Sequence, residues 1–209
     1  MRKKGLAILD WLAAGIMAFC IVGCSPTSRP SDTSQLATVA LELPGAECLK
    51  TENLLEDSQF SNLFGGSWTS VQHGGEPSFQ ISASRGVLEL RRTGSEPWMV
   101  IRQTISLDNW NADGVLRLSA EMKGDLQYEP SLHAFEHMAG LWLQAGPSPK
   151  NAMLAQHYPN KGVWDWQVVT MQTSVAPGST TAMAGFIHQT SGILWVRNPK
   201  LIWTNCEDV

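Results

Sequence analysis

The sequence has none of the short motifs that commonly mark catalysis. It lacks a Gly-x-Ser-x-Gly elbow, a phosphate-binding glycine loop and a Cys/His nucleophile pair. Glycoside hydrolysis needs two carboxylates flanking one bond, and the acidic residues here are scattered without a recognisable pair. The 15 basic residues are outnumbered by 19 acidic ones, which disfavours nucleic acid as a partner. We therefore expect a protein that is not an enzyme and binds no nucleic acid.

The chain also lacks an apolar run suited to spanning a membrane, which takes about 20 residues. Its N-terminal apolar segment, residues 6–22, is interrupted by Asp10 and follows a basic start at residues 2–4. These features are typical of a secretory signal. The segment ends in Ile-Val-Gly-Cys at Cys24, which resembles the lipobox of bacterial prolipoproteins. This resemblance implies cleavage before Cys24, a diacylglycerol on its sulfur and usually a third acyl chain, such as palmitate, on its amino group.

The N-terminal pattern predicts a lipid anchor in the cell envelope. Residues 1–23 are expected to be the signal peptide and residues 24–44 a lipidated flexible tether, rich in Ser, Thr and Pro. Ser25, rather than an aspartate, follows the cysteine, which favours the outer membrane in a cell with two membranes. An ordinary secretory signal with an incidental cysteine, or an uncleaved anchor, is the alternative. Residues 45–209 would form the folded domain.

Cysteine is scarce, with four residues in the whole chain. Cys20 leaves with the predicted signal and Cys24 carries lipid, so Cys48 and Cys206 form the only intramolecular pair that remains. An exported protein meets an environment that permits disulfides. We expect a bridge between these two cysteines, which would close a loop of most of the domain. Two free thiols, or one thiol paired with a partner, are the alternatives.

The domain reads as many short strands between turns, without a long stretch of helical periodicity or an internal repeat. This pattern predicts an all-β sandwich. The expected strands cover residues 78–82, 87–90, 98–103, 115–122, 140–144, 166–172, 182–187, 193–196 and 200–203.

Four segments, in the right order, resemble carbohydrate-binding modules with the galactose-binding-like jelly roll. They are residues 53–60 (NLLEDSQF), 118–124 (LSAEMKG), 166–178 and 192–201. The resemblance implies a jelly-roll fold and a function in glycan binding, and it implies a structural calcium ion between the first and last strands. Glu56, Asp57 and Asn198 are its candidate ligands here, although Ser61 and Asn198 stand where the family commonly has acidic residues. No other cofactor is expected.

Tryptophan supplies the candidate sugar contacts, because an indole face stacks on the C–H face of a sugar ring and its N–H reaches a hydroxyl. Eight tryptophans follow the predicted signal. We expect Trp68, Trp142, Trp166 and Trp195 in the core, where the resembled family buries them. Trp164 is the leading ligand candidate, on one face of an extended chain with Trp166. The turn-flanking Trp98 and Trp110 are the other two.

A polar cluster, His133, Glu136 and His137, adds hydrogen-bonding candidates for sugar hydroxyls. The two histidines would share one face of a helix, as zinc ligands do, but a β-rich setting does not favour a helix. The sequence thus predicts a membrane-anchored, non-catalytic lipoprotein that recognises a glycan or polysaccharide. A structural lipoprotein that binds another envelope protein is the second hypothesis.

Overall fold

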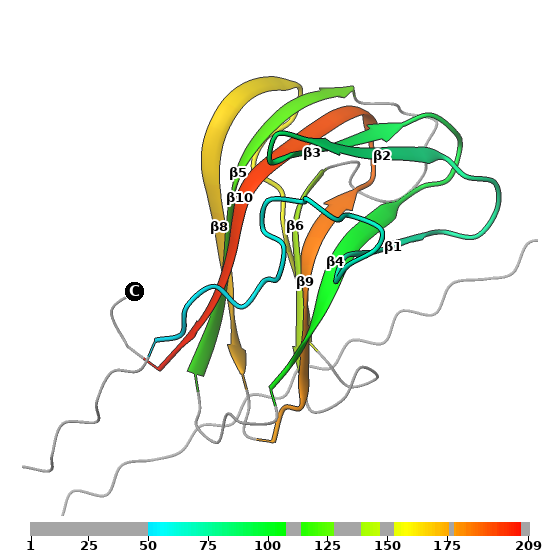
Figure 1. Ribbon diagram of the computed structural model, residues 1–209. Helices are drawn as coiled ribbons and strands as arrows, with labels where there is room; N and C mark the ends of the chain where they lie inside the picture. Colours follow the sequence, from blue (N-terminus) through cyan, green and yellow to red (C-terminus); the bar gives the residue numbers. More distant parts are fainter. Residues whose placement is uncertain (1–49, 108–113, 128–138, 147–152, 176–177, 206–209) are drawn as a thin grey trace, which may run out of the picture. The chain divides into compact units, whose positions relative to one another are not determined.

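A computed structural model describes residues 50–107, 114–127, 139–146, 153–175 and 178–205 (Figure 1). Every regular element in these ranges is a β-strand, and none of them contains a helix with the length and apolar character to cross a membrane. The strands are β1 (Thr69–Gln72), β2 (Phe79–Ser84), β3 (Val87–Arg92), β4 (Met99–Ser106), β5 (Gly114–Gln127), β6 (Ala139–Gly146), β7 (Met153–His157), β8 (Val163–Val175), β9 (Thr181–His188) and β10 (Ser191–Thr204).

The strands form two antiparallel sheets of five strands each. Sheet I has the order β1-β4-β9-β6-β7, and sheet II has the order β2-β3-β10-β5-β8. Apart from the pairs β2-β3 and β6-β7, neighbouring strands are not consecutive in sequence, as Figure 1 shows for β10 between β3 and β5. The chain therefore folds as an all-β jelly-roll sandwich, and the prediction of fold class is confirmed.

Alternation along the strands explains how the sandwich closes. In β5, Leu116, Leu118, Ala120 and Met122 are buried, while the residues between them are half-buried on the opposite face. A two-residue period places one set of side chains between the sheets and the other outside. The interior contains leucines of β3 and β6, Phe186 of β9, and a ring cluster in which Trp68 stacks on Phe186 at 5.8 Å.

The structure differs from the expected strands in two ways. The strands β1 and β7 were not predicted, and the two predicted strands at 193–196 and 200–203 form the single strand β10. A register shift between Arg197 and Lys200 interrupts the pairing of β10 with β5, and Asn198 adopts a φ of 52° there. The polar Asn198-Pro199 pair that suggested a turn is therefore a bulge within one strand.

The first described residues lie beside the end of β10. Lys50 pairs with Thr204, and the backbone N–H of Thr51 donates to the carbonyl of Trp203 at 3.0 Å. The Leu54 N–H donates to the Leu201 carbonyl at 2.8 Å. This segment therefore extends sheet II along the edge of β10 beyond the residues that pair with β3. The predicted signal peptide and tether lie outside the described residues.

Candidate functional site

Several side chains of sheet I point away from the main core and lie on the outer face of the sheet. The core-facing residues of β4 include Met99 and Ile101, so Trp98, Val100 and Arg102 alternate onto the outside. The register continues this face across the sheet, because Val100 pairs with Ile187 of β9. Here Val100 and Ile187 are 6% and 3% exposed, although they lie away from the main core. They belong to a second apolar cluster with Trp142 and Met183, against which Trp98 and Tyr158 pack.

Two glycines leave space on this face. Gly185 of β9 lies opposite Arg102 on one side and Trp142 of β6 on the other. Gly140 lies opposite Ile187. A Cβ at Gly185 would overlap the Ile101 carbonyl oxygen, and a Cβ at Gly140 would overlap that of His157. Only glycine fits these two positions. In the row Arg102-Gly185-Trp142, which runs across the sheet, the middle residue therefore has no side chain to fill the space between its two large neighbours.

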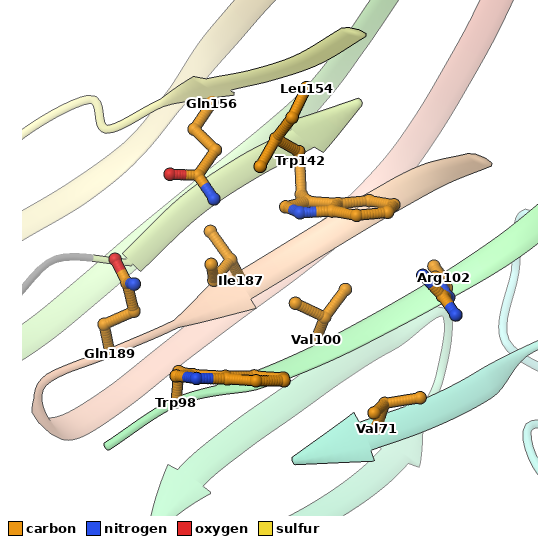
Figure 2. Close-up of a pocket in the computed structure, with 9 residues that line it drawn as sticks. All are labelled: Val71, Trp98, Val100, Arg102, Trp142, Leu154, Gln156, Ile187 and Gln189. Carbon is orange, nitrogen blue, oxygen red and sulfur yellow. The ribbon is translucent and has the colours of Figure 1, made fainter. Parts of the chain in front are cut away.

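The side chains enclose a pocket of about 290 Å³. Figure 2 shows Trp98 and Trp142 along two opposite sides, with Val100 and Ile187 between them as the floor. Arg102 lies at one end, and Gln156 and Gln189 lie at the other. We call this site the Trp98–Trp142 pocket. Its complete lining is Val71, Trp98, Val100, Arg102, Trp142, Leu154, Gln156, Ile187 and Gln189.

A tyrosine holds the two glutamines at one end of the pocket. The Tyr158 hydroxyl lies 2.6 Å from Oε1 of Gln156 and 2.7 Å from Oε1 of Gln189. In Figure 2 the Nε2 atoms of both glutamines point toward the pocket. Among the residues that the structure describes, neither Nε2 has a hydrogen-bond partner. The indole nitrogens of Trp98 and Trp142 also lie toward this end. The glutamine end therefore offers several N–H donors, fixed in position by Tyr158.

Arg102 forms the other end of the pocket. Its guanidinium carbon lies 5.3 Å from the ring centroid of Trp142, a cation–π distance. Within the described part of the chain, its guanidinium has neither an acidic partner nor a hydrogen-bond acceptor. The cation–π contact positions the guanidinium over the indole, and its N–H groups remain available to an incoming acceptor.

Trp98 is the half-buried indole of the pocket, and contacts with His73 fix its position. The His73 ring meets it edge-on at 6.1 Å, and the backbone N–H of His73 donates to the Trp98 carbonyl at 3.1 Å. His73 Nδ1 in turn lies 2.7 Å from a carboxylate oxygen of Glu96. Trp142 is only 6% exposed, because it packs in the apolar cluster and beneath Arg102. Trp98 is thus the indole with a face available for stacking.

The structure gives mixed results for the sequence-predicted tryptophans. It places Trp98 in the lining of the pocket, and it buries Trp68 at 2% exposure, as expected. Trp142 is buried, but in the outer cluster rather than in the main core. Trp166 and Trp195 were expected in the core and instead lie half-buried on the outer face of sheet II. There the Arg197 guanidinium covers the Trp166 ring at 4.2 Å, and Trp195 Nε1 donates to Glu89 at 2.9 Å.

The expectation that Trp164 and Trp166 share a face is wrong. Gln167 pairs with Met122, but Trp164 pairs with Gly124, so β8 has one extra residue between these pairs. A bulge of one residue turns the side chains beyond it to the opposite face. Trp164 consequently packs against the main core, with its indole over Gly124. It lies on the opposite sheet from the Trp98–Trp142 pocket.

Several other predicted residues lie outside the described residues. These are Cys24 of the lipobox, the cysteines Cys48 and Cys206, and the ligand candidates Trp110, His133, Glu136 and His137. The sequence analysis missed Arg102, Gln156, Gln189 and Tyr158. Their only signal is the alternation of polar and apolar residues in β4, and for β7 no strand was expected.

The three candidate calcium ligands have separate partners. The Asp57 carboxylate accepts hydrogen bonds from the backbone N–H groups of Ser61 and Asn62 at 2.7 and 2.8 Å. These bonds outweigh the effect of burial, which alone would raise the pKa, and they hold the pKa of Asp57 below its ordinary value. Glu56 accepts from the Ser67 hydroxyl, and Asn198 donates to Glu121 at 2.7 Å. In the described ranges, no group of three or more His, Cys, Asp or Glu residues is arranged to hold a metal ion.

Comparison with known proteins supports the fold. No family model matches the chain, and no curated protein matches its sequence. The enzymatically active domain of tailspike protein 4 from bacteriophage CBA120 is similar at a TM-score of 0.55 and 15% identity. The match covers 72% of this chain and 21% of the tailspike chain, so this chain corresponds to about a fifth of that protein.

Two further structures are similar to this chain. A Stig cyclase from Fischerella sp. TAU, solved with an indole compound, is similar at a TM-score of 0.51 and 10% identity, over 75% of this chain and 98% of the cyclase. The module TmCBM61, solved in complex with β-1,4-galactotriose, is similar at a TM-score of 0.46 and 12% identity, over 72% of this chain and 98% of the module. At these identities the likeness concerns the fold, and function has to be argued from the site.

Proposed function

We propose that this protein is a non-catalytic carbohydrate-binding lipoprotein that holds a glycan in the Trp98–Trp142 pocket. The observation that carries the proposal is the combination of a stacking platform with fixed polar groups at both ends of one pocket. A pyranose ring has apolar C–H faces and a polar rim of hydroxyls. Trp98 matches the first, and the amides of Gln156 and Gln189 with the Arg102 guanidinium match the second.

The Tyr158 contacts favour hydroxyl recognition further. The Tyr158 hydroxyl lies against the Oε1 atoms of Gln156 and Gln189, and the Nε2 atoms of both amides point toward the pocket. A sugar hydroxyl accepts as well as donates, so these amide N–H groups can donate to the hydroxyls on the rim of a sugar ring.

A binding role without catalysis fits the lining of the pocket. Hydrolysis of a glycosidic bond uses two carboxyl groups about 5–10 Å apart across the bond. The nine residues that line the pocket include no Asp or Glu. We further propose that the lipobox at Cys24 anchors the domain in the cell envelope, with residues 24–44 as the tether. Membrane attachment would place the pocket among the polysaccharides of the envelope or the surroundings.

The first test is replacement of the stacking platform. Trp98→Ala should weaken binding to any glycan that the wild type holds by about tenfold or more, equivalent to about 1.4 kcal/mol. Trp166→Ala is the matched control, because this indole also lies under an arginine but on the outer face of sheet II. Affinity gel electrophoresis on a panel of polysaccharides identifies ligands, and isothermal titration calorimetry measures them.

The controls separate the pocket from the fold. Thermal unfolding of both variants should show that each is folded at the temperature of the assay. If the wild type binds no polysaccharide of the panel, or if Trp98→Ala binds as tightly as Trp166→Ala, the pocket is not a sugar site.

A further inference from the structure

Resting on the proposed function, we propose that the ligand is an acidic glycan whose uronic-acid carboxylate is bound by Arg102. The proposal starts from the charge on the outer face of sheet I. Its strands carry neutral side chains there, including Thr69, Val100, Gln144 and Gln156, with Arg102 as the single ionic group among the described strand residues. An arginine without a protein counter-ion on such a face is available to bind an anion.

The geometry of Arg102 suits a carboxylate. Its side chain is fixed by the Trp142 ring at 5.3 Å, and a guanidinium presents parallel N–H groups that match the two oxygens of a carboxylate. The same planar fork contacts a neutral hydroxyl through one oxygen only. A partly enclosed, mostly apolar pocket also screens the ion pair less than open water does. The interaction should therefore discriminate between acidic and neutral sugars.

Three cations of sheet II have the kind of carboxylate partner that Arg102 lacks among the residues that the structure describes. On sheet II, Arg91 pairs with Glu89, Lys123 with Asp165, and Arg197 with Glu121 at 2.6 Å. Arg102 has no such partner within the described ranges, although the whole chain has more acidic than basic residues. The distance between the two polar ends of the pocket then sets the orientation of the sugar. The carboxylate binds at Arg102, the ring stacks on Trp98, and ring hydroxyls reach the amides of Gln156 and Gln189.

The test compares polymers that differ only in the acid. Polymannuronate, polyglucuronate and polygalacturonate are each assayed beside their carboxyl-reduced forms, in which C6 carries a CH₂OH group. We expect at least one acidic polymer to bind about tenfold or more tightly than its reduced form. Arg102→Gln should reduce this ratio to about one, and Arg102→Lys should retain part of it. Arg197→Gln, which removes a cation that has its own counter-ion, should leave the ratio unchanged.

The outcomes distinguish the two proposals. If a reduced polymer binds as tightly as its acidic form and Trp98→Ala weakens both, the pocket holds neutral glycans and the assignment to acidic ones is wrong. If dextran sulfate binds as tightly as the uronates, the attraction is one of charge alone and the carboxylate assignment is also wrong. If none of the six polymers binds while another polysaccharide of the panel binds and Trp98→Ala weakens it, the acidic ligand is overturned and the glycan function stands; if no polysaccharide of the panel binds, both are overturned.

Discussion

The two outer faces of the sandwich use the same residue types in different ways. On sheet II, the rings of Trp166 and Trp195 lie beneath Arg197 and Lys123, at 4.2 and 6.0 Å. Each of these cations also contacts a carboxylate, and Trp195 Nε1 donates to Glu89. On sheet I, Arg102 covers Trp142 in the same manner, but no carboxylate completes the arrangement among the described residues.

The two faces therefore differ in their remaining capacity for hydrogen bonds and ion pairs with a ligand. The sheet II network holds the pKa of Glu121 below its ordinary value, through hydrogen bonds from Asn198 and Arg197. Its donors and acceptors already have partners within the protein. In the Trp98–Trp142 pocket, the polar groups are positioned by Trp142 and Tyr158 but have unused hydrogen-bonding capacity. The feature that distinguishes the two faces is therefore the carboxylate partner of the arginine, which Arg197 has and Arg102 lacks among the described residues.

The largest expected effect is on the free energy of unfolding, and it concerns a predicted disulfide at the end of sheet II. The pair Lys50 and Thr204 is the last described bridge between the N-terminal segment and β10. Cys48 and Cys206 each lie two residues beyond this pair in the antiparallel direction, so a continued ladder would set them opposite one another. We predict that they form a disulfide. Its reduction should lower the free energy of unfolding by about 4–5 kcal/mol, because it closes a loop of most of the domain.

The disulfide is measured in a variant with Cys20 and Cys24 changed to Ser, which leaves only the two cysteines in question. Alkylation followed by intact mass should add no label before reduction and two labels after it, and urea unfolding with and without reductant gives the change in stability. Two labels in the unreduced, oxidatively prepared protein would rule the bridge out. Glycan binding by the folded reduced protein should persist, since the pocket lies on sheet I.

The second prediction concerns a buried histidine in the interior of the sandwich and its effect on the pH dependence of stability. His188 of β9 is fully buried, with its ring 5.7 Å from that of Phe79 on sheet II. Burial, aided by the charge of Arg92 and opposed by a hydrogen bond with Gly192, lowers the pKa of His188 from 6.5 to about 4. The unfolded chain then binds this proton more readily than the folded one. Stability should fall as pH drops below about 6.5, by about 2 kcal/mol between about pH 7 and about pH 5.

Urea unfolding across this range tests the histidine. In His188→Gln the pH dependence should lose the contribution of one proton, about 1.4 kcal/mol per pH unit at its steepest. An equal slope in wild type and His188→Gln would show that this histidine does not titrate on unfolding.

Local pattern was enough to predict the fold but not to orient every strand. Alternating residues in β2 and β5 indicated strands, and the turns between the expected strands indicated a sandwich. The bulge in β8 has no local sequence signature, because it arises from pairing with β5, and it reversed the face of Trp164. For the same reason, the bulge at Asn198 was mistaken for a turn between two strands.

The pocket was only partly predictable because its residues come from strands far apart in the chain. Trp98 stood beside a turn and was a ligand candidate on that ground. Arg102, Trp142 and Gln156 become one site only through the row in which β4, β9, β6 and β7 pair. Two glycines keep this row open, and nothing in a single sequence distinguishes Gly140 and Gly185 from glycines of turns.

The smallest predicted effect comes from a substitution that gives Arg102 of sheet I a carboxylate neighbour, as Arg197 of sheet II has. Thr69 of β1 pairs with Arg102 of β4, so Thr69→Glu would place a carboxylate beside the unpaired guanidinium, as Glu121 lies beside Arg197. We expect the variant to fold with nearly unchanged stability, since surface ion pairs contribute only about 0–1 kcal/mol. Its affinity for the acidic polymer should fall by about tenfold, while Thr69→Gln, of equal size without charge, should bind nearly as wild type does. Calorimetric titration of both variants measures the difference. If Thr69→Glu and Thr69→Gln bind the polymer equally, the absence of a counter-ion is not what distinguishes sheet I from sheet II.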